Sequence, residues 1–318
     1  MGRVFREPAN MCPEGEGVWY QLKILWRLMR AWGIADAELT ARFGLSDITI
    51  HTDRDGYFRL DLPLSEPPPA DRLWHPVHLR LDAPVTIDVE AEVFIPKTDC
   101  SFVVISDIDD TVMHTGVANK IMMMWRLFAS GADGRTVFPG MASFLRALHQ
   151  GPTRRDANPM LYVSRAHWAI YGVLDRFFNR HDIPVGPILF LRDWGLTLQH
   201  PLPRRGKGHK IGLIQQMITH YAAHPFILIG DSGQRDPEIY ADIVHRFPDR
   251  VLAVYIRDVS GDPKRDLAIK RLAAELAKSG HSLLLAADSR AMAEHAVEQG
   301  FIAKTALTEI AKETRAAV

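Results

Sequence analysis

An apolar run of the chain ends in a cluster of acidic residues, at Val103-Val104-Ile105-Ser106-Asp107-Ile108-Asp109-Asp110-Thr111. Its β-branched residues favour a buried strand. Such a strand does not normally end in three carboxylates, because like charges held together out of water cost stability unless they are paired. A hard divalent cation with oxygen ligands would relieve that repulsion. The stretch therefore predicts a buried strand whose end binds a cation.

Strand and helix patterns alternate from Ser101 onward. Short apolar runs predict strands at Phe102–Asp107, Met160–Ser164, Ile188–Leu191, Phe226–Asp231, Val251–Ile256 and Ser282–Ala286. Helices are expected between them, for example over Met141–Gln150, Ala169–Asn179, Ile211–Ala222 and Pro237–Arg246. The last segment, 262–318, reads as a helix, a strand and a helix, with Leu267, Leu272 and Leu276 on one apolar face. This alternation indicates an α/β fold, a Rossmann-like parallel sheet with helices on both faces, in which ligands bind at the carboxyl ends of the strands.

The first hundred residues instead alternate polar and apolar side chains with the period of half-buried antiparallel strands. Ile48–His51 and Tyr57–Leu62 read as a hairpin through the turn at Asp55-Gly56. Val77–Leu81 and Val85–Val93 read as two further strands. We therefore predict a small, mostly antiparallel β domain over residues 1–98, with a helical insertion near 18–43, and an α/β domain over residues 99–318.

The predicted helical insertion runs from Val18 to about Phe43. Lys23, Arg27 and Arg30 lie on one helical face, opposite apolar residues. A helix packed on the sheet is the favoured interpretation. A helix that lies on a membrane surface is the alternative, so a peripheral contact with a membrane stays open.

The composition is that of a globular, electrically neutral protein. The 318 residues contain 38 basic and 38 acidic side chains, and 47% of the residues are hydrophobic. Zero net charge argues against a protein that coats a polyanion, so no nucleic-acid partner is expected. Residues 1–10 lack the pattern of a secretory signal, and no stretch of about 18 apolar residues is free of charge. These features lead us to expect a cytoplasmic protein, either free or peripheral at the membrane surface.

Polar side chains at the ends of the predicted elements fit the chemistry of phosphoryl transfer. A carboxylate at Asp107 can attack phosphorus and form an aspartyl-phosphate, which splits one difficult hydrolysis into two easier steps. Asp109, two residues later, can protonate the leaving alcohol and then take a proton from water. The residues themselves therefore predict hydrolysis of a phosphomonoester.

Acidic residues at two strand ends are candidates for a Mg²⁺ site. Mg²⁺ would neutralise the approach of an anionic nucleophile to an anionic phosphate. Asp231 with Asp107 can hold the ion, and Asp236 can support it directly or through water. The acidic set assigned to the metal is Asp107, Asp109, Asp231 and Asp236.

The transferring phosphoryl oxygens need donors of positive charge or hydrogen bonds. Ser164 ends a predicted strand, and Lys210 directly precedes the apolar start of a predicted helix. Lys207 is the alternative to Lys210 as the phosphate-binding lysine. The remaining basic residues of that loop are interpreted as a solvated surface.

This layout resembles the haloacid dehalogenase superfamily, in which Asp-x-Asp-x-Thr, a strand-terminal serine, a lysine at a helix start and Gly-Asp-x-x-x-x-Asp occur in this order. Longer runs resemble one branch of it, the actin-patch-type phosphatidate phosphatases of fungi and their bacterial relatives. These runs are Ile105–Thr111, Phe138–Gly140, Leu191–Gly195, Gly230–Tyr240 and Val254–Val259. The resemblance covers about Ser101–Ser260 and implies that the α/β domain predicted over residues 99–318 is a haloacid dehalogenase-like catalytic domain. It also implies Mg²⁺-dependent dephosphorylation of phosphatidate to diacylglycerol.

The chain departs from that branch after the strand-terminal serine, where the family usually has Ser-Pro-Trp. Here the run is Ser164-Arg165-Ala166-His167-Trp168. Arg165 would add a cation beside the phosphate, so the predicted phosphate-binding set is Ser164, Lys210 and Arg165. His167 would add a group that titrates near neutral pH. The departure leaves the leaving-group preference open.

Two rival functions remain at this point. A phosphatase of the same superfamily that acts on a soluble phosphomonoester would share every catalytic residue. A docking or scaffold protein that uses its β domain would need neither Asp107 nor Asp109. The expected partner is therefore a phosphorylated small molecule or lipid. Asp110 is expected to brace the turn rather than react.

Overall fold

The computed structural model describes residues 2–5, 33–64, 66, 68–69, 72–83, 85–97, 99–113, 137–164, 171–190 and 207–316. These residues divide into two compact units, one that ends at Lys97 and one that begins after it. The second unit contains the predicted acidic strand end.

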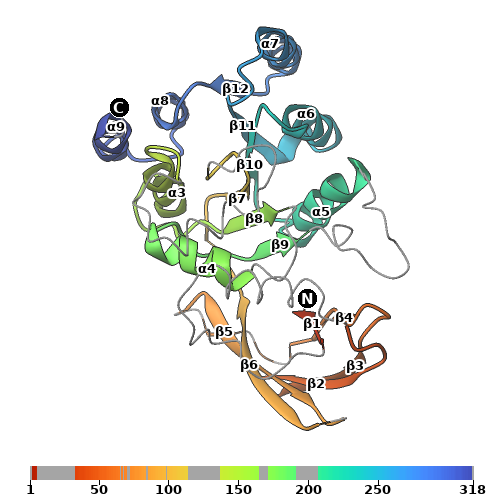
Figure 1. Ribbon diagram of the computed structural model, residues 1–318. Coiled ribbons are helices and arrows are strands. Elements are labelled where there is room, and N and C mark those ends of the chain that lie inside the picture. The colour runs from red at the N-terminus through yellow and green to blue at the C-terminus, as the bar shows by residue number, and fades with distance from the viewer. Residues whose placement is uncertain are drawn as a thin grey trace, which may run out of the picture. The chain divides into compact units, whose positions relative to one another are not determined.

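The second unit is built on a six-stranded sheet in which all paired neighbours are parallel (Figure 1). Its spatial order is β12-β11-β10-β7-β8-β9. The strands are β7 (Val103–Asp107), β8 (Met160–Ser164), β9 (Ile188–Phe190), β10 (Phe226–Asp231), β11 (Val251–Arg257) and β12 (Leu283–Ala286). Each predicted strand of this region is present, within one residue at either end.

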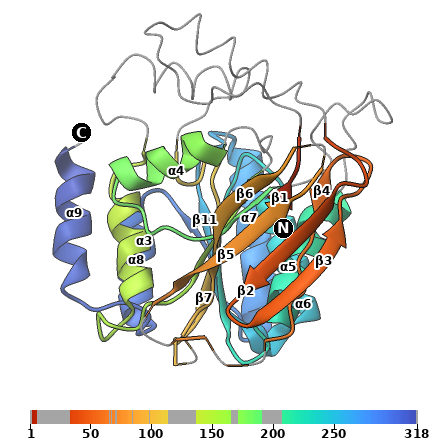
Figure 2. The ribbon, with the colours of Figure 1, turned by 90° about the horizontal axis from the view of Figure 1, so that it is seen from below.

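Helices cover both faces of this sheet, which confirms the predicted Rossmann-like α/β fold. Figures 1 and 2 show α3, α8 and α9 on one face and α5, α6 and α7 on the other. The helices are α3 (Met141–Gln150), α4 (Tyr171–Arg180), α5 (Lys207–His220), α6 (Asp236–Arg246), α7 (Pro263–Lys278), α8 (Ser289–Glu298) and α9 (Ala306–Ala316), with a 3₁₀ turn at Pro248–Arg250.

The order of the strands explains why polar groups collect in one place. The chain leaves β7 through β8 and β9 on one side and returns on the other side at β10. The boundary between β7 and β10 is therefore a topological switch point, where ligands bind beyond the carboxyl ends of the strands. Because Ser106 pairs with Ile229, Asp107 and Asp231 end two neighbouring strands at the same edge. Residues of β7, β8 and β10 are buried throughout, as expected for strands covered on both faces.

The final segment differs from its prediction in two ways. A third helix, α9, follows α8 and packs against it and against α3. Among the side chains of α9 that the structure describes, only Ile310 is fully buried, which explains why no apolar stripe indicated the helix. In α7, Leu276 is buried as predicted but Leu267 is 50% exposed, because Ile269 instead lies on the buried face.

The first unit is a four-stranded antiparallel sheet of order β3-β2-β5-β6, with a separate two-stranded ribbon. A small core of Ala37, Leu39, Phe58 and Leu81 lies within it. The sheet strands are β2 (Glu38–Phe43), β3 (Ser46–His51), β5 (Trp74–Leu81) and β6 (Ile87–Phe94), and the ribbon pairs β1 (Gly2–Arg3) with β4 (Tyr57–Phe58). The strands predicted near 77–81 and 85–93 are confirmed.

The predicted hairpin between residues 48–51 and 57–62 is wrong in its pairing. The turn itself forms, since Gly56 has φ 80° and Asp53 accepts hydrogen bonds from the N–H groups of Asp55 and Tyr57. However, β3 pairs with β2 and β4 pairs with β1. Alternation shows which face of a strand is buried but does not choose its partner, and the connection at Gly44 joins β2 to β3 more directly.

The predicted helix over 18–43 is wrong from Gly33 onward. Asp36 has φ 53°, in the left-handed region, and Glu38–Phe43 forms β2 with Leu39 and Ala41 facing the core. Apolar side chains at alternate positions fit a strand of this sheet better than a helix. Residues 18–32 lie outside the described part of the chain. Among the described residues, no helix is both long and apolar enough to cross a membrane.

Candidate active site

The acidic turn after β7 is a tight, hydrogen-bonded loop. The N–H of Ile108 donates to the carbonyl of Val163 at 3.3 Å, which ties the turn to β8. Asp110 has φ 57°, and its N–H donates to the carbonyl of Met113 at 2.9 Å. A left-handed backbone at a non-glycine residue is tolerated by aspartate and marks a sharp turn. Asp110 thus stands where the chain reverses.

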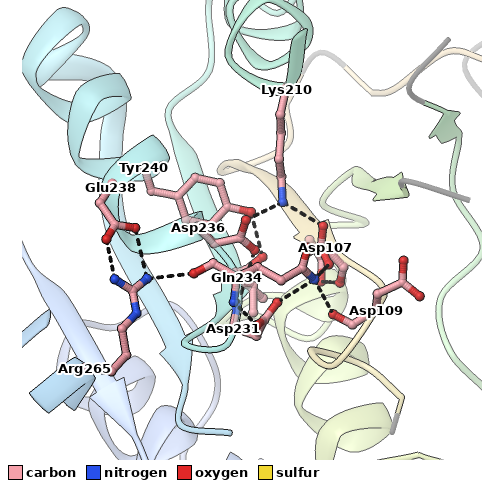
Figure 3. A network of polar contacts seen from close by, with 11 residues as sticks. Asp107, Asp109, Lys210, Asp231, Gln234, Asp236, Glu238, Tyr240 and Arg265 are labelled. Atoms are coloured by element: carbon pink, nitrogen blue, oxygen red, sulfur yellow. Dashed lines mark hydrogen bonds and ion pairs between the residues drawn. The ribbon is translucent and has the colours of Figure 1, made fainter. Parts of the chain in front are cut away.

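Lys210 links the acidic strand end to a second carboxylate. Its Nζ lies 2.6 Å from Asp107 Oδ1 and 2.6 Å from Asp236 Oδ1 (Figure 3). The three side chains are at most 2% exposed, so this is a buried ion network. The side chain of the alternative lysine, Lys207, lies outside the described atoms.

Burial and charge act against each other in this network. Burial by itself lowers the pKa of Lys210, but the charges of Asp107 and Asp236 outweigh it and raise that pKa well above its ordinary value. Burial raises the pKa of Asp107 well above its ordinary value, and the carboxylates of Asp236, Asp109 and Asp231 raise it further, while Lys210 lowers it. Lys210 therefore stays a cation, and Asp107 needs neighbouring positive charge to stay an anion.

The loop from Asp231 to Asp236 carries the second acidic group. Asp231 Oδ1 accepts a hydrogen bond from the N–H of Gln234 at 2.8 Å, and the N–H of Asp231 donates to Asp236 Oδ2 at 3.4 Å. Asp236 begins α6, where the helix dipole favours a negative charge. Burial and the charge of Asp236 raise the pKa of Asp231 to about 7.

Three buried carboxylates are close enough to share a metal ion. Oxygen atoms of Asp107, Asp231 and Asp236 all lie within 4.8 Å of one another. The raised pKa values of Asp107 and Asp231 indicate that, among the described residues, Lys210 alone does not offset three ionised carboxylates, and a divalent cation would relieve this imbalance. An all-oxygen donor set suits Mg²⁺. Asp109, the fourth residue predicted for the metal, presents its main-chain carbonyl to the amide of Gln234 (Figure 3).

Ser164 ends β8 at the same edge and is 1% exposed. The parallel pairing of Asp107 with Val163 places this serine one position beyond the level of Asp107. Arg165 and His167 lie outside the described residues. The structure thus brings Asp107, Asp109, Ser164, Lys210, Asp231 and Asp236 to one edge of the sheet.

Two arginines to which the sequence analysis assigned no role hold the two acidic turns by hydrogen bonds to main-chain carbonyls. Arg265 of α7 donates to the carbonyl of Ser232 at 2.9 Å and to that of Gln234 at 2.7 Å. It also forms a two-pronged ion pair with Glu238 of α6 (Figure 3). Arg257, at the end of β11, donates to the carbonyl of Thr111 at 3.2 Å. Both roles depend on contacts between distant elements, so no local pattern indicates them.

Gly230 lies where any larger residue would clash with the buried ion network. A Cβ at this position would lie 2.7 Å from Asp236 Cβ and 2.8 Å from Tyr240 Cε2. Such separations are well inside van der Waals contact. The glycine before Asp231 is therefore required by the packing of Asp236.

The geometry agrees with comparisons to known proteins. Residues 102–258 match the family model described as phosphatidate phosphatase APP1, catalytic domain. That match contains both acidic turns, Ser164 and Lys210. Residues 102–258, just under half of the chain, are thus similar to an APP1-type catalytic domain. The matched segment contains the strands from β7 to β11, whereas Arg265 lies beyond it.

Two fungal proteins are each similar to about half of the chain. The phosphatidate phosphatase APP1 of Saccharomyces cerevisiae is 31% identical over 153 residues, which are 48% of this chain and 25% of that protein. An uncharacterised protein of Schizosaccharomyces pombe is 28% identical over 159 residues, which are 50% of this chain and 25% of that protein. The chain thus aligns with about a quarter of the length of each curated relative.

Replacing Gly230 by alanine should disrupt the APP1-type site from within. The new methyl group would push Asp236 away from Lys210, and overpacking of this kind costs about 1–3 kcal/mol. We expect urea denaturation to show that loss in the free energy of unfolding. Gly212→Ala is the matched control, because a Cβ there meets nothing within 4 Å; equal stability of the two variants would contradict the packing argument.

Arg265→Ala should weaken the site without touching any catalytic group. The variant frees the carbonyls of Ser232 and Gln234, and loss of a partner that orients metal ligands typically costs about 10–100-fold in metal affinity or activity. Calorimetric titration with Mg²⁺ and phosphate release from an aryl phosphate measure the two effects. Arg290→Ala, which breaks an exposed ion pair with Glu294 at 2.7 Å, should change neither. An Arg265→Ala variant with unchanged cation affinity and turnover would show that the loop holds its shape alone.

Proposed function

We propose that this chain is a Mg²⁺-dependent phosphomonoester hydrolase that forms an aspartyl-phosphate on Asp107, with phosphatidate as its substrate. The observation that carries the proposal is the buried ammonium of Lys210 held at 2.6 Å from Asp107 and Asp236, beside Asp231. The APP1-type family match supports the same reaction class. A protein used only for docking would need no such buried charge network.

Asp107 is proposed as the nucleophile. One of its oxygens attacks phosphorus while the bond to the leaving alcohol breaks, and Asp109 donates the proton that the alcohol needs. Water then attacks the phosphorus of the aspartyl-phosphate and gives its proton back to Asp109. The phosphorus–oxygen bond to Asp107 breaks, which releases inorganic phosphate and restores the enzyme.

Lys210 and Ser164 are proposed to bind the phosphoryl oxygens, with Arg165 as the third predicted member. Lys210 gives one N–H to Asp107 and one to Asp236. An ammonium has three N–H donors, so the third can be donated to a phosphoryl oxygen. Charge that develops on the transferring group is thereby met by a donor already fixed in place.

The carboxylates of Asp107, Asp231 and Asp236 fit a divalent cation, because they are buried, close together and only partly neutralised. When bound, Mg²⁺ would supply the positive charge that lets a carboxylate approach an anionic phosphate. The protein residues keep that arrangement dry and fixed. Lys210 holds two of the carboxylates, and Arg265 holds the loop that carries the third.

Phosphatidate is the proposed substrate because the Saccharomyces cerevisiae relative is named a phosphatidate phosphatase. The family match over residues 102–258 contains the proposed catalytic, phosphate-binding and metal-binding residues Asp107, Asp109, Ser164, Arg165, Lys210, Asp231 and Asp236. We further propose that the protein meets this lipid as a peripheral protein at a membrane surface, with residues 1–98 as a separate β domain and residues 99–318 as the catalytic domain. A soluble phosphomonoester is the competing substrate.

Asp107→Asn should abolish turnover while leaving the protein folded. The amide is a poor nucleophile toward phosphorus, so we expect a loss of at least about 10³-fold, the scale seen when a covalent catalyst is removed. Phosphate release in Mg²⁺ measures turnover, and a circular dichroism melt checks folding. Asp242→Asn, which removes a partly exposed carboxylate on α6 that pairs with Arg246, serves as control. Turnover that survives in Asp107→Asn would remove the nucleophile assignment.

A substrate panel separates the lipid from the soluble alternative. We expect Mg²⁺-dependent phosphate release from phosphatidate in mixed micelles to exceed that from glycerol phosphate, sugar phosphates and nucleotides. Chelation by EDTA should stop the reaction, and added Mg²⁺ should restore it. Preference for a soluble ester would keep the reaction class and reject phosphatidate.

A further inference from the structure

Gln234 lies at the centre of the acidic site, although its side chain has no part in the proposed reaction. Its Nε2 lies 2.9 Å from Asp231 Oδ2, 3.3 Å from the carbonyl oxygen of Asp109 and 3.5 Å from Asp107 Oδ2 (Figure 3). The three oxygens come from the ends of two strands and converge on one amide nitrogen. All three are acceptors, so the amide must present its NH₂ group to them rather than its oxygen.

The amide fills this oxygen cage incompletely. A primary amide has two hydrogens, whereas three oxygens surround the nitrogen. Only the contact with Asp231 has the length of a good hydrogen bond, and the other two are long. A divalent cation interacts with all of its oxygen ligands at once, at about 2.0–2.6 Å. The cage is thus better suited to a cation than to the amide that now lies in it.

The amide and a cation cannot occupy the cage together. A cation bound by Asp107 and Asp231 would lie among the same oxygens that receive the amide hydrogens, and positive charge repels an N–H group. The backbone N–H of Gln234 donates separately to Asp231 Oδ1 at 2.8 Å. The side chain can therefore rotate away while the loop keeps its anchor.

We propose that Gln234 is a built-in competitor for the divalent cation of this site. Its amide closes the oxygen cage before a cation binds and leaves the cage when one enters. This inference rests on the proposed metal-dependent function, because it needs a cation that binds at Asp107 and Asp231. It assigns to Gln234 the role of setting the cation affinity, not a catalytic one.

The inference predicts an unusual direction of change, since removing a side chain from a metal site should tighten binding. The hydrogen bonds of Gln234 stabilise the closed state that the cation must open. A hydrogen bond to a charged group is lost on opening, and its strength corresponds to roughly tenfold in affinity. Gln234→Ala should therefore bind Mg²⁺ about tenfold more tightly than the wild-type protein. Gln234→Asn, whose amide is one methylene too short to reach the cage, should behave like Gln234→Ala.

The test is isothermal titration calorimetry of the full chain with Mg²⁺ alone and with Mn²⁺ alone, after removal of metal with EDTA. Gln216→Ala is the matched control, because Gln216 is an exposed glutamine on α5; its cation affinity should equal that of the wild-type protein. Thermal melts with and without Mg²⁺ check that each variant is folded. They should also show a larger stabilisation by Mg²⁺ in Gln234→Ala than in the wild-type protein.

Each outcome has a distinct meaning. Tighter cation binding in both Gln234 variants supports the proposal that the amide of Gln234 competes with the cation. Equal or weaker binding in Gln234→Ala, with measurable binding in the wild-type protein, overturns it and leaves the metal-dependent phosphatase standing. If the wild-type protein binds neither cation, the proposed metal-dependent function itself fails, and the role of Gln234 falls with it.

Discussion

The ammonium of Lys210, buried between Asp107 and Asp236, is the interaction on which the rest of the site depends. A single carboxylate taken out of water is expensive, and three close together are more so. Lys210 makes the burial tolerable for two of them, at 2.6 Å each. Removing one partner of such a pair leaves an uncompensated charge, which typically costs about 3–5 kcal/mol. The position of Lys210 is therefore fixed by the protein's own carboxylates and needs no substrate.

The buried ion network around Lys210 constrains the surrounding backbone. Lys210 comes from α5, Asp107 from β7 and Asp236 from α6, so three elements must meet within hydrogen-bond distance. Arginines then hold the intervening turns by their carbonyls, Arg257 at the first acidic turn and Arg265 at the second. Arginine suits this task because its planar group carries several donors in fixed directions. The proposed catalytic groups are thus positioned by side chains that themselves need no contact with substrate.

The sequence predicts the α/β sheet well because its strands are buried on both faces and read as continuous apolar runs between polar loops. The six catalytic candidates at the strand and helix ends meet for the same reason, since parallel strands bring their carboxyl ends to one edge. Their roles remain predictions. The strand pairing predicted in the first unit was wrong, because alternation shows which face of a strand is buried but does not choose the strand's partner. Gln234 and Arg265 were missed because their contacts exist only after distant elements pack together.

The charges also impose an order on binding. With Asp107, Asp231 and Asp236 ionised, Lys210 leaves two negative charges uncompensated in a buried site. A phosphomonoester is itself an anion, and electrostatic repulsion is stronger in the protein interior than in water. An approaching phosphate would meet that excess charge unless a dication had already entered. On the proposed mechanism, the same dication would also displace the amide of Gln234 from the cage. The cation would therefore bind before the substrate, and its affinity, which the proposed competitor would lower, would set how much of the enzyme is ready to react.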